Sequence, residues 1–265
     1  MKTGTILTAL AVMAVLSSCW GNKKKAAAEE QAAATEIAEE SADVVSIFNG
    51  ENFEGWRGYG REDMPERWTI DQGAMKINGN GTGEGDANII YTVPYINFRL
   101  TFEYKVAKGA NSGVFFYVKE LPGEPIYISA PEYQILDNAN HPDARLGVDG
   151  NRASASLYDM LPAKPQNAKP FGEWNTAGIM VYKGTVIHYQ NDEPVVEYHL
   201  WTPEWTALIE ASKFSSTNPY WPLAYDLLTA KLGKDDEGNL VGGYIGLQDH
   251  GDDVWFRNLK VEILD

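Results

Sequence analysis

Apolar and polar residues alternate with a period of two along much of the chain from Val44 onward. In residues 98–106, large apolar side chains alternate with charged or hydroxyl-bearing ones. Alternation of this kind predicts a β-strand with one buried face, as in antiparallel sheets. We predict further strands in the apolar runs Asn88–Val93, Val114–Val118, Ala177–Tyr182, Val186–Tyr189, Tyr244–Leu247 and Trp255–Leu264.

Turn residues separate these runs and favour an all-β fold. Lys183-Gly184 joins two of the runs, and Asn191-Asp192 turns into a third. Many short strands joined by such turns are typical of a β-sandwich or jelly roll. Because no second domain is evident, we predict a single β-sandwich domain over residues 44–265.

One short helix is predicted to interrupt the strands. Thr202 can cap its N-terminus, Pro203 suits its first turn, and its apolar face continues to about Lys213. The stretch Leu121–Gly172 is rich in proline and is predicted to be mostly irregular. Long ordered loops in compact domains are usually functional, so we expect functional residues in this stretch.

The first 43 residues differ from the rest and indicate export with a lipid anchor. The apolar run Ile6–Leu16 is too short to span a bilayer as a helix. It leads into Leu16-Ser17-Ser18-Cys19, which is similar to a bacterial lipoprotein signal. We expect a signal peptide over residues 1–18, then a lipidated Cys19 and an Ala/Glu-rich spacer over residues 19–43.

The charge balance argues against a nucleic-acid partner. The 265 residues include 37 acidic and 22 basic side chains, a formal charge of −15, whereas phosphate binding requires a basic face. The single cysteine permits neither an internal disulfide nor a zinc site built from cysteines. No phosphate-binding loop, HExxH zinc helix or GxSxG nucleophile motif occurs. We therefore expect a folded, acidic protein that contacts a membrane only through its lipid anchor.

The first concentration of candidate chemistry is the run Glu132–Asn138, followed by His141. In an extended segment, Glu132 and Gln134 point to one side of the chain and Asp137 to the other. Carboxylates in such a run could act in pairs, as acid and as nucleophile or base, in ordinary glycoside hydrolysis.

The second concentration is Gln248–Asp253, in which His250 lies between acids at the end of a predicted strand. An imidazole suits proton transfer because its ordinary pKa is near 6.5. A polar turn whose aspartates cap main-chain amides would explain the same residues. His188 is expected to be a strand histidine with polar neighbours.

The tryptophans bear on the class of ligand. Trp174 and Trp221 lie in polar or proline-rich surroundings, and most of the others are expected to fill the core. Aromatic platforms beside carboxylates and amides suit the flat C–H faces and hydroxyl edges of sugars. The residues therefore leave two functions open, a conventional glycoside hydrolase and a glycan-binding protein without catalysis.

Several short motifs occur in a fixed order along residues 44–265. They are Ile47-Phe48-Asn49-Gly50 with Gly55-Trp56, Asn111-Ser112-Gly113-Val114-Phe115-Phe116, Glu132-Tyr133-Gln134-Ile135-Leu136-Asp137-Asn138 with His141-Pro142-Asp143, Leu157-Tyr158-Asp159, Gly172-Glu173-Trp174-Asn175, Ser212-Lys213-Phe214, and Gly246-Leu247-Gln248-Asp249-His250-Gly251 with Phe256-Arg257-Asn258. Together they resemble the 3-keto-disaccharide hydrolase family, long catalogued only as a domain of unknown function. One departure is Ala155-Ser156, where the family pattern leads us to expect a Gly-Ala pair.

The resemblance implies a concanavalin-like jelly roll and the cleavage of glycosides already oxidised to a ketone at sugar carbon 3. A ketone at carbon 3 acidifies the hydrogen on carbon 2, so the protein needs a base, an electrophile for the enolate oxygen and an acid for the leaving oxygen. Under this resemblance the base is either His250 or Glu132. The catalytic candidates are His250, Glu132, Asp249 and Asp137, and the substrate-binding candidates are Gln134, Gln248, Arg257, His141, Tyr158, Trp174 and Lys213.

The same resemblance bears on cofactors, partners and location. A divalent metal is a candidate electrophile, as in enolase-type sites, with Asp137, Gln134, Asp249 and Arg257 available to ligate it, orient substrate or stabilise the enolate. An oxidoreductase acting upstream on the sugar is an expected partner. We expect the protein to be anchored to a bacterial outer membrane, on the periplasmic side.

Overall fold

The computed structural model describes residues 44–80 and 86–265. The expected signal peptide, the lipidated Cys19 and the spacer therefore lie outside the described residues. Among the residues that are described, no helix is both long enough and apolar enough to cross a bilayer.

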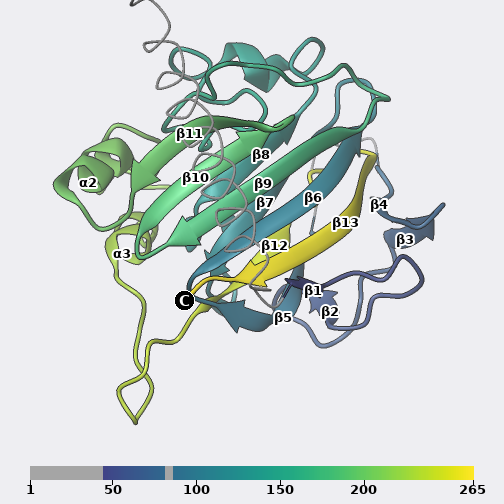
Figure 1. Cartoon of the computed structure of the whole chain (residues 1–265). Helices are drawn as coiled ribbons and strands as arrows, with labels where there is room; N and C mark the ends of the chain where they lie inside the picture. The colour runs from purple at the N-terminus through teal and green to yellow at the C-terminus, as the bar shows by residue number, and fades with distance from the viewer. Residues whose placement is uncertain (1–43, 81–85) are drawn as a thin grey trace, which may run out of the picture. The chain divides into compact units, whose positions relative to one another are not determined.

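Two antiparallel sheets pack face to face in a sandwich of the jelly-roll type (Figure 1). The eight-stranded sheet has the order β11-β10-β9-β6-β13-β4-β3, and β1 pairs with β13. Its strands are β1 (Val44–Ser46), β3 (Trp68–Asp71), β4 (Ala74–Ile77), β6 (Phe98–Val106), β9 (Asn175–Tyr182), β10 (Thr185–Gln190), β11 (Glu193–His199) and β13 (Val254–Ile263). The five-stranded sheet has the order β2-β5-β12-β7-β8. Its strands are β2 (Trp56–Gly58), β5 (Ile89–Tyr95), β7 (Asn111–Val118), β8 (Glu132–Leu136) and β12 (Gly243–Leu247).

The predicted period-two alternation is confirmed in β6. Its five apolar side chains are buried between the sheets, while the residues between them face outward and are exposed or half-buried. The main core combines such inward-facing side chains from both sheets. Burial of this apolar surface, at about 25 cal/mol per Å², is the principal driving force for the sandwich.

The predicted helix forms but is shorter than expected, and a second one was not predicted. Thr202 caps α2 (Pro203–Glu210) by accepting a 3.2 Å hydrogen bond from the amide of Trp205, and the helix ends before Lys213. Helix α3 (Ala224–Thr229) follows Leu223, whose side chain cannot cap it, so no capping residue in the sequence marks its start. Two 3-10 turns, η1 (Ile126–Ile128) and η2 (Pro142–Arg145), lie within the long irregular stretch.

The outer face of the smaller sheet is also covered. All eight residues of β7 are buried. A second apolar cluster lies on that outer face and includes Phe115 of β7 and Ile126 of η1. The connection between β7 and β8 therefore covers part of this face. A site can form between the sheet and the segments that cover it.

His188 on β10 is fully buried and holds one of these loops. Its Nδ1 donates to the carbonyl oxygen of Ala155 at 2.9 Å, so Nε2 accepts from the Tyr198 hydroxyl at 3.3 Å. Ala155 adopts a left-handed φ of 65°, which explains why a glycine is expected there. Burial lowers the pKa of His188 from 6.5 to about 4.

We expect the stability contributed by neutral His188 to be complete above pH 6.5 and to be lost as the pH falls toward 4. The unfolded chain binds a proton in this range and the folded chain does not, a difference of roughly 3 kcal/mol. Urea unfolding at pH 7 and pH 5 measures the loss. His188→Gln, which can make both hydrogen bonds but does not titrate, should show a smaller loss. An equal loss in both proteins would contradict the assignment.

Candidate functional site

A cavity of about 200 Å³ lies over the outer face of the smaller sheet, where β12, β7 and β8 are neighbours. It is lined by Asn111, Tyr127, Glu132, Gln134, Tyr158, Lys213, Trp221, Gln248 and His250. The structure therefore brings together six of the residues singled out as site candidates, namely Glu132, Gln134, Tyr158, Lys213, Gln248 and His250.

Strand alternation explains how the sheet residues reach this cavity. On β8, Tyr133 and Ile135 pack into the main core between the sheets, so Glu132 and Gln134 project to the opposite face. The expectation that these two share one side of the strand is confirmed, because both line the cavity. Asn111 reaches the same face from β7.

Gly113 on β7 makes room for the carboxylate of Glu132. A Cβ atom at position 113 would lie 2.3 Å from Oε1 of Glu132, a distance that real Cβ atoms do not tolerate. A glycine here permits the close approach of a neighbouring group. The carboxylate therefore occupies the space above the strand that any side chain at position 113 would fill.

Gly113→Ala is expected to displace the carboxylate of Glu132 and to lower the activity on the substrate proposed below by about 10²-fold, the usual cost of an ångström-scale misplacement. Gly233→Ala is the matched control, because nothing lies within 4 Å of its added Cβ. Activity of G113A within twofold of wild type, with an unchanged melting temperature, would contradict this role for the glycine.

Glu132 and Lys213 are the two oppositely charged side chains of the cavity. Burial raises the pKa of Glu132 above its ordinary range, while the nearby Lys213 partly opposes the rise and Asp143 adds to it. Burial likewise lowers the pKa of Lys213, with Glu132 and Asp159 opposing. Among the described residues no ion pair within 4.0 Å joins the two. They are close enough for each to influence the pKa of the other without forming a direct ion pair.

Three polar atoms of cavity-lining side chains are buried and have no hydrogen-bond partner among residues 44–80 and 86–265. They are Oδ1 of Asn111, Oε1 of Gln248 and Nδ1 of His250. Buried polar groups in folded proteins are almost always paired, and a group left unpaired costs about 1–3 kcal/mol. Three unsatisfied groups around one small cavity indicate a site that completes its hydrogen bonds with a polar ligand.

Three side chains beside the cavity could hold a cation. Ligand atoms of His141, His250 and Asp252 lie within 4.8 Å of one another. However, Nδ1 of His141 accepts a 3.1 Å hydrogen bond from the amide of Asp143, so the neutral ring carries its hydrogen on Nε2. If Nε2 of His141 bound a metal ion, Nδ1 would carry the hydrogen and could not accept this bond, whereas metal-binding histidines usually donate a hydrogen bond from the nitrogen that does not bind the metal. The cluster therefore fits a metal ion only in part, and we derive no step from one.

Asp143, Arg152 and Asp159 form an ion network behind the cavity wall, which sequence reasoning missed. Arg152 contacts Asp143 at 3.0 Å and Asp159 at 2.6 Å. Asp143 also accepts from the Tyr158 hydroxyl at 3.0 Å, and Asp159 from the Lys213 amide at 2.7 Å. The network thereby fixes two residues of the wall. Arg152 lies in the irregular stretch, where no periodic pattern marks it.

The structure does not bring Asp137, a predicted catalytic residue, to the cavity lining. Its carboxylate accepts hydrogen bonds from the amides of Gly109 and Ala139 and from the side chain of Asn140, and it does not line the cavity. Its oxygens are therefore occupied in holding the loop after β8.

Asp249, another predicted catalytic residue, also has its carboxylate engaged within the protein. Its fully buried carboxylate forms a 2.7 Å ion pair with Arg67 and accepts from the amides of Ala87 and Gly251. It orders the turn that carries His250 and does not line the cavity.

Arg257 and Trp174, two expected substrate-binding residues, lie elsewhere. The Arg257 guanidinium stacks 3.9 Å from the centroid of the Trp174 ring and donates to Glu103 on neighbouring β6. This pair belongs to the outer face of the larger sheet, because Phe256 between Trp255 and Arg257 faces the core. The structure therefore does not bring either residue to this cavity, and their role in substrate binding stays a prediction.

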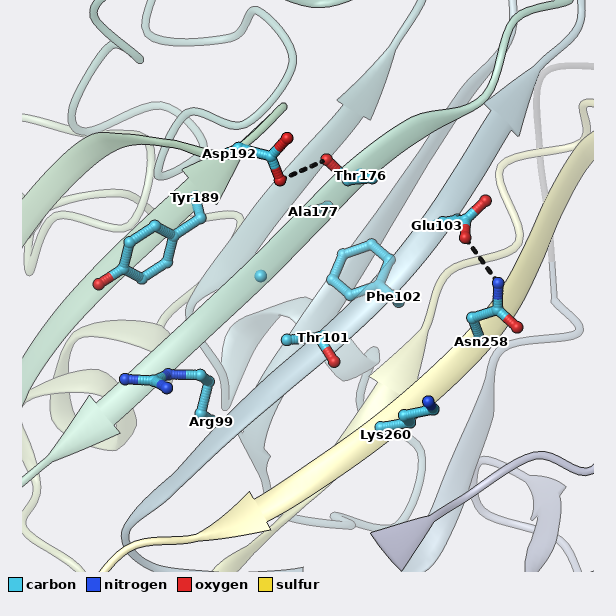
Figure 2. Close-up of a pocket in the computed structure, with 11 residues that line it drawn as sticks. Arg99, Thr101, Phe102, Glu103, Thr176, Ala177, Tyr189, Asp192, Asn258 and Lys260 are labelled. Atoms are coloured by element: carbon cyan, nitrogen blue, oxygen red, sulfur yellow. Dashed lines mark hydrogen bonds between the residues drawn. The ribbon is translucent and has the colours of Figure 1, made fainter. Parts of the chain in front are cut away.

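A hollow on that outer face crosses β6, β9 and β13 (Figure 2). Glu103 there accepts from Asn258 at 2.6 Å, and Thr176 lies 3.5 Å from Asp192. The described residues that line the hollow are Arg99, Thr101, Phe102, Glu103, Thr176, Ala177, Gly178, Tyr189, Asp192, Asn258 and Lys260. They include no histidine and no buried carboxylate, so proton-transfer chemistry is better supported in the smaller cavity.

Comparison with known proteins agrees with the geometry. A family model described as a 3-keto-alpha-glucoside-1,2-lyase-like domain matches residues 43–262. A protein of Bacteroides thetaiotaomicron named 3-keto-disaccharide hydrolase is 51% identical over 282 aligned positions, which cover 95% of each chain.

Solved structures show the same fold. A crystal structure of a protein from Parabacteroides distasonis, suggested to be a glycosyl hydrolase, matches with a TM-score of 0.68 at 25% identity, covering 84% of this chain and 94% of that one. A second from the same organism matches with a TM-score of 0.57 at 23% identity, covering 84% and 100%. Since the family model and the curated relative both match nearly the whole of the described fold, this chain belongs to the 3-keto-alpha-glucoside-1,2-lyase-like family of enzymes.

Proposed function

We propose that the protein cleaves 3-keto-glycosides, 3-keto-disaccharides among them, by removing the hydrogen on carbon 2 of the oxidised sugar. The observation that carries the proposal is the arrangement of Glu132 and Lys213, a carboxyl group and an amino group that line one small cavity and, among the described residues, form no ion pair within 4.0 Å. A base and an electrophile separated in this way suit the hydrogen and the carbonyl oxygen of adjacent carbons.

The reaction follows from the ketone. A base removes the carbon 2 hydrogen, and the electrons pass to the carbon 3 oxygen to form an enolate. The enolate then expels the oxygen substituent of carbon 1, which takes a proton, and leaves a double bond between carbons 1 and 2. Addition of water across this bond, with hydroxyl on carbon 1 and hydrogen on carbon 2, makes the net result a hydrolysis.

Glu132 is the proposed base. A carboxylate whose pKa is raised by burial removes a carbon-bound proton better than an ordinary one, because base strength rises with pKa. Lys213 is the proposed group that stabilises the negative charge developing at the carbon 3 carbonyl. His250 lines the same cavity and is the proposed donor for the leaving oxygen, with Gln248 and Asn111 accepting from sugar hydroxyls.

A conventional glycosidase is less well supported. It requires two carboxylates facing one glycosidic bond, about 5–5.5 Å or 6.5–9.5 Å apart. Glu132 is the one carboxylate among the described residues that line the cavity. A purely glycan-binding protein would not need a buried carboxylate, a lysine and a histidine in the same small space.

The proposed reaction requires an upstream partner, and the N-terminal sequence bears separately on location. Because the substrate already carries a ketone at carbon 3, a sugar oxidoreductase must supply it. We propose further that lipidated Cys19 anchors the protein to an outer membrane, on the periplasmic side, in agreement with the signal-like sequence that precedes it.

A matched pair of substrates tests the function. The purified protein is incubated with a glucoside and with its 3-keto counterpart, and release of the aglycone is followed together with ultraviolet absorbance from a conjugated enone. Release from the ketone alone is expected, and an enone signal would mark the elimination step. Release from the unoxidised glucoside at a similar rate would overturn the proposal in favour of direct hydrolysis.

A further inference from the structure

The ammonium of Lys213 is surrounded by aromatic rings rather than by hydrogen-bond acceptors. Its Nζ lies 4.3 Å from the centroid of the Tyr158 ring, 5.1 Å from that of Phe214 and 5.4 Å from that of Tyr127. Within the described part of the chain, Nζ makes no hydrogen bond and no ion pair. Ring faces attract a cation but accept its protons only weakly.

The main chain of Lys213 is held on both sides. Its amide donates to Oδ2 of Asp159 at 2.7 Å, and its carbonyl oxygen accepts from the side chain of Asn218. The backbone position is therefore fixed, while the end of the side chain has no bond to keep it in place. A lysine held in this way can move its Nζ toward a ligand without breaking a hydrogen bond or an ion pair to the described residues.

Desolvation favours the neutral amine at this position. Burial lowers the pKa of Lys213, although Glu132, Asp159 and Asp143 oppose the shift. A neutral lysine amine in an apolar setting is the nucleophile that forms Schiff bases with carbonyl substrates. The proposed substrate presents a ketone to the cavity that this amine lines.

Resting on the proposed function, we propose that Lys213 is a catalytic residue that forms a Schiff base with carbon 3 of the keto sugar. The Nζ–C3 bond forms as the amine attacks the ketone. The ketone oxygen takes one proton from the nitrogen and one from solvent and leaves as water, which gives an iminium ion. Glu132 then takes the carbon 2 hydrogen, and the electrons move to nitrogen to give an enamine.

The remaining steps return the lysine unchanged. The enamine expels the substituent of carbon 1, which leaves with a proton, and gives an iminium conjugated to the new double bond. Water adds to carbon 1 and a proton returns to carbon 2. Hydrolysis of the iminium restores the ketone and the free amine, so no oxidant or reductant is consumed.

Reductive trapping tests the covalent step on the full chain. The protein is mixed with a 3-keto-glucoside and cyanoborohydride, which reduces an iminium in preference to a ketone, and its intact mass is measured. One reduced sugar is expected per chain, at Lys213 by peptide mapping. The unoxidised glucoside serves as the control and should add no mass.

Substitution separates a covalent role from a charge. Lys213→Arg keeps the positive charge but cannot form the iminium, so kcat/KM should fall by roughly 10³-fold or more. Lys105→Arg, on the outer face of the larger sheet, is the matched control. Alkylation of Lys213→Cys with 2-bromoethylamine restores an amine and should recover activity. Wild-type protein treated in the same way is the control for alkylation of Cys19, the single native cysteine.

The outcomes distinguish this proposal from the proposed function. Cleavage of the ketone without a trapped adduct, together with K213R activity within tenfold of wild type, would overturn the Schiff base and leave the function standing. No cleavage of the ketone by wild type would overturn both.

Discussion

Glu132→Gln is expected to lower kcat/KM for a 3-keto-glycoside by about 10²- to 10⁴-fold, the range measured for lost general bases. Glutamine keeps the shape of the side chain that fits over Gly113 but cannot take the carbon 2 proton. Stopped assays of aglycone release measure the loss. Glu193→Gln, exposed on β11, is the matched control and should be unchanged.

The pH profile of the wild-type enzyme provides a second reading of the same residue. The base acts in its ionised form, so activity should rise with pH as Glu132 loses its proton. Because burial raises the pKa of Glu132, the rise should lie above the range of an ordinary glutamate, about 4.3. A flat profile, or full activity of both Glu132→Gln and His250→Ala, would contradict the assignment.

Arg152→Met is expected to lower the free energy of unfolding by about 3–5 kcal/mol, the usual cost of removing one partner from a buried ion network. The side chains of Asp143 and Asp159 are only 13% and 8% exposed, so both carboxylates would lose their counter-charge in a largely dry position. Urea denaturation followed by tryptophan fluorescence measures the change.

Arg61→Met provides the comparison for this prediction. Arg61 pairs with Asp63 at 2.6 Å, but both side chains are about half exposed or more, so the loss should be below 1 kcal/mol. Similar losses for the two variants would show that the Arg152 network does not stabilise the fold. Partial loss of activity in R152M is also expected, because Tyr158 and the Lys213 amide are held by the same aspartates.

Local periodicity made most of the fold and part of the site predictable. Alternation along β8 placed Glu132 and Gln134 on one side because a strand repeats every two residues regardless of its partners. The same rule places Arg257 beside Trp255 on an outer face. The family resemblance suggests a substrate-binding role for Arg257, and the alternation of β13 places that residue away from the cavity over the smaller sheet.

The features of the site that could not be predicted from the sequence depend on contacts between distant segments. Asp249 bonds the Ala87 amide and Arg67, and Asp137 bonds the Gly109 amide, so neither carboxylate is free for chemistry. No spacing within their own motifs shows this. Arg152 is hidden for a similar reason, since its role appears only when separate parts of the connection between β8 and β9 meet one another and the segment after α2.

The fate of the carbon 2 hydrogen tests the central claim most directly. A 3-keto-glycoside labelled with deuterium at carbon 2 is cleaved in ordinary water, quenched early, and the released sugar is analysed by mass spectrometry. We expect the loss of one deuterium for each aglycone released. Substrate and released keto sugar incubated without enzyme give the background exchange, which is subtracted. Full retention of deuterium in the cleaved sugar would show that carbon 2 is not deprotonated and would contradict the proposed mechanism.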